Sequence, residues 1–256
     1  MIITLTTDFG LIDPYVGVMK GVILGLASAA NIVDLTHDIP SYDIQGGAFA
    51  LASAVRHFPE GTVHVVVVDP GVGGARFPIA AERGGQRFVG PDNGVLSLAL
   101  GMLEGEMAAH RIANESWFRH PVSQTFHGRD IFAPTAAHLA LGEPVSAAGP
   151  RIGAIAQLTP PGNQGRGARV LNIDKFGNIV TSLRPGELGR GFGLRIGGRE
   201  VRGLLSSYED APTGELFAIE GSAGFVEISL KEDSAALALS VRRGAQIEVE
   251  TGDVNH

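Results

Sequence analysis

The first half of the chain places acidic and imidazole side chains directly after apolar, β-branched segments that are typical of strands. These side chains are Asp8, His37, Asp38 and Asp69. In open α/β sheets, ligands bind beyond the carboxyl ends of the strands, so side chains from separate strands converge on one crevice. Each Asp could instead cap the loop or helix that follows it. Capping explains one Asp more easily than the whole set, so we expect a shared site with carboxylates and an imidazole.

A glycine-rich loop, DPGVGGAR, runs from Asp69 to Arg76 after the most apolar of these segments. It lacks the Gly-Lys-Ser/Thr ending of a Walker loop and the spacing of a dinucleotide-binding fingerprint. Its glycines would form a tight turn or allow a ligand to approach the backbone closely. An arginine after such a loop could hold a carboxylate through a forked, bidentate pair of hydrogen bonds.

Four further segments contain residues that could bind or react. His127 lies in FHGRD, just before a predicted helix, although a lone histidine is more often structural. Residues 92–94, DNG, are predicted to form a turn. Residues 174–178, DKFGN, could form a hairpin or a ligand loop that offers a carboxylate, an aromatic face and an amide. Residues 221–224, GSAG, could likewise be a turn or a backbone cradle.

The elements that must position these groups alternate between strand and helix in the first half. Strands are predicted over Ile2–Thr6, Asn31–Leu35, Thr62–Val68, Pro78–Ala81 and Arg87–Val89. Helices are predicted over Tyr15–Leu26, from an N-cap at Ser41 to Ala54 or His57, over Val95–Leu103 and over Ile131–Leu141. The valine run before Asp69 is typical of a central strand covered on both faces. The alternation predicts an α/β domain with a largely parallel central sheet.

The second half of the chain has a different pattern of predicted secondary structure. Residues 159–167, TPPGNQGRG, are predicted to be a linker between an N-terminal domain, 1–158, and a C-terminal domain, 168–256. Beyond the linker, short strands with intervening Gly-containing turns predict a small all-β barrel or sandwich. These strands are Val170–Ile173, Asn178–Leu183, Phe192–Ile196, Glu215–Ile219, Phe225–Leu230 and Gln246–Glu250.

Composition narrows the function classes. The chain has 256 residues and a formal net charge of -7, which argues against the basic footprint of non-specific nucleic-acid binding. It contains no cysteine, so disulfides, thiolate catalysis and cysteine zinc sites are excluded. No apolar run approaches membrane-spanning length, and the first residues show no signal-peptide pattern. We therefore expect a cytoplasmic protein with no nucleic-acid or membrane partner.

Taken in order, the chemistry-bearing segments resemble the fluorinase/chlorinase superfamily, and more narrowly its S-adenosylmethionine hydroxide adenosyltransferase branch. The matching segments are TTDFG (6–10), THDIP (36–40), VDPGVG (68–73), GPDNG (90–94), FHGRD (126–130), IDKFGN (173–178) and GSAG (221–224). Each segment alone is a weak signal, but the ordered set spans nearly the whole chain. The resemblance implies an N-terminal α/β domain and a C-terminal β-barrel. It also implies a homotrimer with each substrate site between the N-domain of one subunit and the C-domain of a neighbour.

The resemblance implies attack at C5′ of the substrate ribose with loss of methionine. The water-using branch has an Asp-Arg-His set, which falls on Asp69, Arg76 and His127. The fluoride-using branch has a Tyr at the position of Asp69 and a Ser at the position of Gly128, so this sequence favours water over halide. The implied reaction is hydrolysis of S-adenosyl-L-methionine, a small-molecule substrate, to adenosine and methionine. It requires no metal and no cofactor.

The resemblance also assigns groups that contact the substrate. They are Asp8 for the ribose hydroxyls, Tyr42 for the pocket wall, Phe126 and Phe176 for stacking or wall positions, Asp174 and Ser222 for the methionine amine and carboxylate, and Asn178 and Glu227 for the adenine. The fluorinase has an Arg after its equivalent of Ser222, where this chain has Ala223. Recognition of the methionine carboxylate must therefore differ from that in the fluorinase.

Two other functions fit the residues without the resemblance. A metal-dependent nucleotide phosphatase or related hydrolase would use oxygen and imidazole ligands. The available ligands are Asp8, Asp13, His37, Asp38, Asp69, Asp92 and His127. The absence of a compact ligand motif such as HExxH weakens this alternative. A nucleoside-binding module without turnover would use the same pocket.

Overall fold

Three β-branched segments of the first half form neighbouring parallel strands. β1 (Ile2–Thr7) pairs in parallel with β2 (Asn31–Thr36) on one side and with β3 (Val63–Val67) on the other. All of β3 is buried, as the valine run predicts for a central strand. The predicted parallel α/β sheet is therefore confirmed. The structure, a computed structural model, describes residues 1–158, 167–189 and 191–250.

Three more strands extend this sheet to the order β2-β1-β3-β5-β4-β6. β5 (Gln86–Pro91) pairs in parallel with β3, whereas β4 (Pro78–Arg83) and β6 (Ala108–Arg111) are antiparallel to their neighbours. β6 was not predicted, because its residues AAHR show no apolar alternation. The strands that precede Asp8 and Asp69 therefore lie in the parallel part of the sheet, β2-β1-β3-β5. The other end of the sheet, β4 and β6, is antiparallel.

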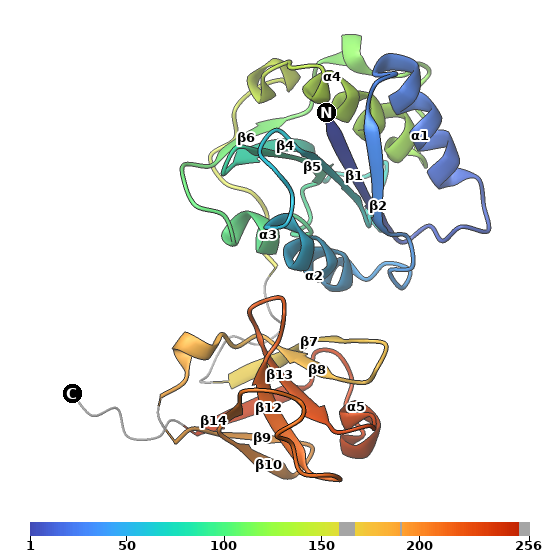
Figure 1. Ribbon diagram of the computed structural model, residues 1–256. Helices are drawn as coiled ribbons and strands as arrows, with labels where there is room; N and C mark the ends of the chain where they lie inside the picture. Colours follow the sequence, from blue (N-terminus) through green and yellow to red (C-terminus); the bar gives the residue numbers. More distant parts are fainter. Residues whose placement is uncertain (159–166, 190, 251–256) are drawn as a thin grey trace. The chain divides into compact units, whose positions relative to one another are not determined.

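Helices cover both faces of the sheet (Figure 1). They are α1 (Tyr15–Leu26), α2 (Ile44–Val55), α3 (Ser97–Gly101) and α4 (Ala133–Ala140), with short 3₁₀ turns at Glu115–Trp117 and Val145–Ala148. The chain steps one way from β1 to β2 and the opposite way from β2 to β3. Right-handed crossovers therefore place α1 and α2 on opposite faces. In the ranges that the structure describes, no helix is long and apolar enough to cross a membrane.

Helix boundaries differ from the prediction in three places. The predicted N-cap Ser41 is wrong, because Asp43 caps α2 by accepting a hydrogen bond from Gly46 N at 2.9 Å. Tyr42 has a φ of 70°, so the chain reverses there and cannot enter the helix earlier. The helix predicted from Ile131 begins instead with a π-helical turn, Gly128–Phe132, which leads into α4. The helix predicted over Val95–Leu103 is reduced to α3.

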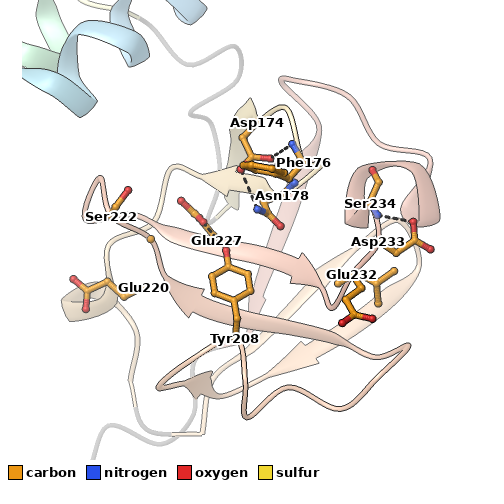
Figure 2. A pocket seen from close by; sticks show the side chains of 12 residues that line it. Asp174, Phe176, Asn178, Tyr208, Glu220, Ser222, Glu227, Glu232, Asp233 and Ser234 are labelled. Carbon is orange, nitrogen blue, oxygen red and sulfur yellow. Dashed lines mark hydrogen bonds between the residues drawn. The ribbon is translucent and has the colours of Figure 1, made fainter.

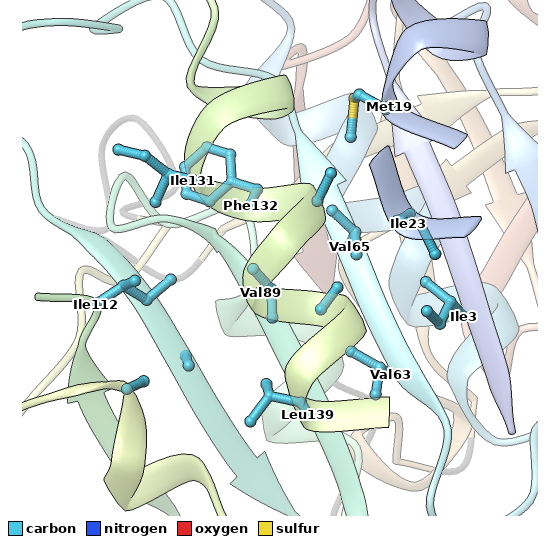
Figure 3. Packing of buried hydrophobic residues seen from close by; sticks show 14 of the residues in the cluster. Ile3, Met19, Ile23, Val63, Val65, Val89, Ile112, Ile131, Phe132 and Leu139 are labelled. Atoms are coloured by element: carbon cyan, nitrogen blue, oxygen red, sulfur yellow. The ribbon is translucent and has the colours of Figure 1, made fainter. Parts of the chain in front are cut away.

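The core of the first unit lies between the sheet and the helices α1 and α4. Strand side chains meet helix side chains there, as Figure 3 shows. The strands contribute Ile3, Val63, Val65 and Val89, and the helical segments contribute Met19, Ile23, Phe132 and Leu139. Phe132 is fully buried at the end of the π-helical turn, so packing fixes the segment that carries His127.

The chain divides into two units, Met1–Leu158 and Thr159–His256. Of the predicted linker, residues 159–166 lie outside the described residues, and Gly167 already belongs to the first strand of the second unit. Within residues 167–189 and 191–250, the second unit forms an eight-stranded sheet in the order β10-β9-β14-β7-β8-β13-β12-β11. Its strands are β7 (Gly167–Ile173), β8 (Ile179–Thr181), β9 (Gly193–Ile196), β10 (Arg199–Arg202), β11 (Leu204–Leu205), β12 (Leu216–Glu220), β13 (Val226–Leu230) and β14 (Gln246–Glu250).

This sheet curls into a nearly closed barrel, with contacts between β10 and β12 near its two ends. The predicted barrel is therefore confirmed. A 3₁₀ turn, Pro185–Glu187, follows β8, and one short helix, α5 (Ala235–Leu239), follows β13. The sequence analysis did not predict α5, which begins where Ser234 Oγ accepts a hydrogen bond from Leu237 N at 3.1 Å. It also missed β10 and β11, whose exposed positions give no clear alternation.

Candidate active site

Arg76 connects the two side chains that the resemblance groups with it. Its Nε donates to Asp69 Oδ1 and Oδ2, both at 3.0 Å, and its Nη2 donates to Asp69 Oδ2. The same Nη2 lies 2.8 Å from His127 Nδ1. The side chains of Asp69 and Arg76 are only 4% and 10% exposed. The structure therefore brings the predicted set of three together as one hydrogen-bonded group.

Two loops meet to build this group. Asp69 follows the end of β3, and the glycine-rich loop returns Arg76 toward it. Gly73 has a φ of +74°, and a Cβ there would collide with the backbone carbonyl oxygen of Gln124. Gly73 thus allows the glycine-rich loop to pack closely against the segment at Gln124. That segment leads directly to His127. The positive φ fits a turn, and the close approach at Gly73 is that of another chain segment.

The bond from Arg76 defines the tautomer of His127. A guanidinium has only donors, so His127 Nδ1 must accept and the neutral ring carries its hydrogen on Nε2. Burial lowers the pKa of His127 from 6.5, and the positive charge of Arg76 lowers it further, while Asp69 and Asp130 oppose the shift. His127 is therefore held as a neutral imidazole whose Nε2–H is a donor.

Asp69 and His127 lie in the wall of a cavity of about 420 Å³ in the first unit. The predicted residues Asp8, Tyr42 and Phe126 line the same cavity. Asp8 Oδ2 accepts a hydrogen bond from the backbone N of Tyr42 at 2.8 Å. Burial raises the pKa of Asp8, and the negative charge of Asp69 raises it further. The remaining lining residues are Phe9, Asp13, Tyr15, Ser41, Val67, Val72, Thr125 and Gly128.

The alternative of a metal-dependent hydrolase requires several acidic and imidazole side chains to meet around one ion. In the described part of the chain, no group of three or more such side chains is arranged to hold a metal. His37 is buried with its Nδ1 2.8 Å from Thr7 Oγ1 and its Nε2 3.0 Å from Asp34 Oδ1. Asp92 accepts a hydrogen bond from Ala156 N at 2.7 Å. His37, Asp38 and Asp92 do not line the cavity, so of the four residues in the first sequence pattern only Asp8 and Asp69 reach it.

The second unit has its own pocket, with a volume of about 710 Å³ (Figure 2). It is lined by all five residues that the resemblance assigns to this half: Asp174, Phe176, Asn178, Ser222 and Glu227. Asp174 Oδ1 accepts from the backbone N of Phe176 and of Asn178, and its Oδ2 accepts from Asn178 Nδ2, each at 2.9 Å. Asp174 therefore folds the loop and orients the Asn178 amide, while Phe176 remains 67% exposed.

Tyr208 lines this pocket and was missed by the sequence analysis. Its Oη donates to Glu227 Oε2 at 3.2 Å, and the two side chains face each other in Figure 2. Burial raises the pKa of Glu227, with a smaller contribution from Asp174. A Cβ at Gly221 would overlap the Glu227 carboxylate, so a larger residue there would displace that side chain. The available signal was an aromatic side chain in the otherwise polar segment SSYED, residues 206–210.

The first unit is an α/β unit with a hydrogen-bonded Asp-Arg-His group, and the second is a β-barrel unit whose pocket contains an aromatic ring and an amide. These two features together define the class of two-domain protein that the resemblance predicts. The chain belongs to the SAM hydroxide adenosyltransferase family. The model of the family's N-terminal domain matches residues 3–149, and that of its C-terminal domain matches residues 168–248. The predicted family is therefore confirmed.

Individual relatives agree with this family. The chain is 42% identical over 259 residues to the (R)-S-adenosyl-L-methionine hydrolase of Salinispora arenicola, with 98% of each chain covered. It is 40% identical over 253 residues to the enzyme of that name from Thermus thermophilus, with 95% of this chain and 97% of the relative covered. A fluorinase from Nocardia brasiliensis is 26% identical over 295 residues, covering 98% of this chain and 97% of the fluorinase.

A solved structure has a similar fold over most of the chain. The crystal structure of an uncharacterized conserved protein from Thermotoga maritima superposes with a TM-score of 0.85 at 35% sequence identity. It covers 98% of this chain and 100% of the Thermotoga chain.

Proposed function

We propose that this protein hydrolyses S-adenosyl-L-methionine by attack of water on the ribose C5′, which yields adenosine and methionine. The observation that carries the proposal is the hydrogen-bonded group of Asp69, Arg76 and His127, of which Asp69 and His127 line a cavity. The names of the relatives support the same reaction and point to the (R) epimer at sulfur as the substrate. No metal or cofactor takes part in the proposed reaction.

The reaction is a direct in-line displacement. The sulfonium is already cationic and leaves as a neutral thioether, so the leaving group needs no acid. Water is a weak nucleophile, and a positioned base contributes roughly 10²–10⁴-fold to such a step. Holding the water in line with the carbon–sulfur bond contributes further through orientation.

We infer the roles within the group from the tautomer of His127. His127 Nε2 carries a hydrogen, so it orients the attacking water as a donor and does not accept its proton. Asp69 is then the proton acceptor. As the new C–O bond forms, the water oxygen becomes strongly acidic, so a carboxylate is basic enough at that stage. Arg76 holds Asp69 in place and stabilises its charge through charge-assisted hydrogen bonds.

The substrate contacts divide between the two pockets. Asp8 would accept from the ribose hydroxyls, with Tyr42 and Phe126 at the wall of the same cavity. In the second unit, Phe176 would stack on the adenine while Asn178 and Glu227 contact its polar edge. Asp174 and Ser222 would contact the methionine amine and carboxylate. S-adenosyl-L-methionine is a charged intracellular metabolite, so the proposal places the enzyme in the cytoplasm.

The reaction is tested with both sulfonium epimers in water enriched in ¹⁸O. We expect adenosine and methionine from the (R) epimer, with ¹⁸O in the 5′-hydroxyl of adenosine and no loss of rate in excess chelator. Methylthioadenosine as product would mean attack at a different carbon and would overturn the proposal. Activity that disappears with chelator would favour the metal-dependent hydrolase.

The proposal includes a homotrimer in which each site joins the first unit of one subunit to the second unit of a neighbour. Large apolar side chains are exposed in both units and offer surface for such a contact. In the first unit Leu11, Ile12 and Tyr42 are 70%, 100% and 71% exposed, and in the second unit Phe176 and Leu237 are 67% and 79% exposed. Isolated exposed apolar residues are common, but these include residues of the proposed site.

Mixed oligomers test this arrangement. Asp69→Asn inactivates the first unit of one subunit, and Asn178→Ala weakens the second unit of another. If sites form between neighbours, random assembly of the two variants restores about one quarter of wild-type activity. Activity no higher than that of the separate variants would show that each site lies within one subunit.

A further inference from the structure

We propose that Phe9, Tyr15 and Phe126 form an aromatic wall that selects the cationic sulfonium of the substrate over a neutral thioether. The inference rests on the proposed function and adds a specificity role for Phe9 and Tyr15. Both residues line the same cavity as Asp69 and His127.

The three rings contact one another. The ring centroids of Phe9 and Tyr15 lie 5.8 Å apart, those of Phe9 and Phe126 5.9 Å apart, and those of Tyr15 and Phe126 5.1 Å apart. Their interplanar angles are 58°, 76° and 82°, so no two of these rings stack face to face. The Arg129 guanidinium lies 5.4 Å from the Phe126 centroid, so that ring already attracts one cation.

The charges of the cavity match the same ligand class. Its described lining residues include the carboxylates of Asp8, Asp13 and Asp69 but no lysine or arginine. Burial raises the pKa of Asp8 and the negative charge of Asp69 raises it further, so the Asp8 carboxylate is repelled by its neighbour. A cation bound between the carboxylates and the ring faces would relieve this repulsion. Aromatic faces together with carboxylates are typical of sites that bind quaternary cations.

The position of the sulfur follows from the proposed reaction. The water between Asp69 and His127 must face C5′, and the sulfur is bonded to C5′ on the side away from the water. During attack the water oxygen bonds to C5′, the C5′–S bond breaks with its electron pair going to sulfur, and Asp69 receives the proton. The sulfur is then neutral and loses its attraction to the rings. The wall therefore favours binding of substrate and release of methionine.

The test compares two inert ligands by calorimetry. One is S-adenosyl-L-homocysteine, a neutral thioether, and the other is the analogue in which a protonated methylated nitrogen replaces the sulfonium. We expect the wild type to bind the cation more tightly, and Tyr15→Leu to reduce that preference by about 3- to 30-fold. The matched control Tyr15→Phe keeps an aromatic face and should keep the preference. Phe9→Leu provides a second variant.

The outcomes separate the inference from the proposed function. A preference that is equal in the Tyr15→Leu, Phe9→Leu and Tyr15→Phe variants would overturn the aromatic wall, even if the wild type hydrolyses S-adenosyl-L-methionine. Absence of adenosine formation by the wild type would overturn the proposed function. The binding preference is measured with ligands that do not react, so each result is obtained without the other.

Discussion

The two pockets of this protein differ in how firmly their side chains are held in place by burial and hydrogen bonds. In the first unit, Asp69 and Arg76 are nearly buried and joined to His127 by hydrogen bonds. In the second unit, the loop around Asp174 is fixed by hydrogen bonds, yet Phe176 projects from it with most of its surface exposed. Proton transfer depends on fixed geometry, whereas recognition of an aromatic base needs an accessible face. In this protein the groups proposed to react are therefore fixed by contacts with one another, whereas the proposed binding group Phe176 is left exposed.

We expect the largest effect from replacing Asp69, which belongs to the hydrogen-bonded group in the first unit. Asp69→Asn keeps the shape of the side chain but removes the proton acceptor, so we expect kcat to fall by about 10²–10⁴-fold with KM nearly unchanged. Steady-state kinetics with adenosine detection measures the effect. The matched control is Asp38→Asn, since Asp38 is exposed and does not line the cavity. Full turnover by Asp69→Asn would sink the assignment of the base.

Substitutions of His127 separate a donor from a base. His127→Leu removes the Nε2–H donor, and we expect a loss of about 10²-fold in kcat. His127→Gln retains an amide donor near the position of Nε2 and should recover about tenfold of that loss. A glutamine cannot serve as a base at neutral pH. Equal inactivity of the Leu and Gln variants, with both folded by circular dichroism, would contradict a donor role.

Replacing Phe176 tests the role of the exposed aromatic ring in the pocket of the second unit. Phe176→Ala removes the stacking face, so we expect KM to rise by about tenfold while kcat changes little. Phe176→Tyr keeps the aromatic face and serves as the control. A fall in kcat with unchanged KM would mean that the exposed ring acts on the chemical step, and the contrast between the two pockets would be lost.

A buried histidine far from the reacting group gives the smallest effect on activity and a measurable effect on stability. His64 is fully buried between Thr4 and Gln86, and burial lowers its pKa to about 4. Between pH 6.5 and 4 the unfolded chain binds a proton at His64 that the folded chain excludes. Stability therefore falls as the pH is lowered through this window, by up to about 3 kcal/mol. Denaturant titrations of the wild type and His64→Gln should show a shallower pH dependence in the variant, and identical slopes would refute the prediction.

The sequence predicts the strand ends well because strands depend on local side-chain patterns. Asp8 and Asp69 reach one cavity because they follow neighbouring parallel strands. His37 follows a strand of the same sheet, but its ring packs against Thr7 and Asp34, and no local pattern reports that direction. The roles of the second pocket came from the resemblance and not from spacing.

Two residues that line the pockets were missed because no local pattern points to a role for either of them. Tyr208 lies in a turn, and Tyr15 opens α1 among residues whose pattern indicates only a helix. The N-cap at Asp43 in place of Ser41 depends on the left-handed conformation of Tyr42, which no residue type in that segment demands. Loop side chains of this kind are placed by tertiary contacts, so composition and spacing do not reveal them.

The contact between Gly73 and the carbonyl of Gln124 ties together two loops that are far apart in the sequence. One loop carries Asp69 and Arg76, and the other carries His127, so a displacement of either is transmitted to both. For directed evolution, the two loops constitute a single unit of variation. If only one loop is varied, most variants will lose the alignment between Asp69 and His127. If both loops are varied together, their fit can be kept while the shape of the cavity changes.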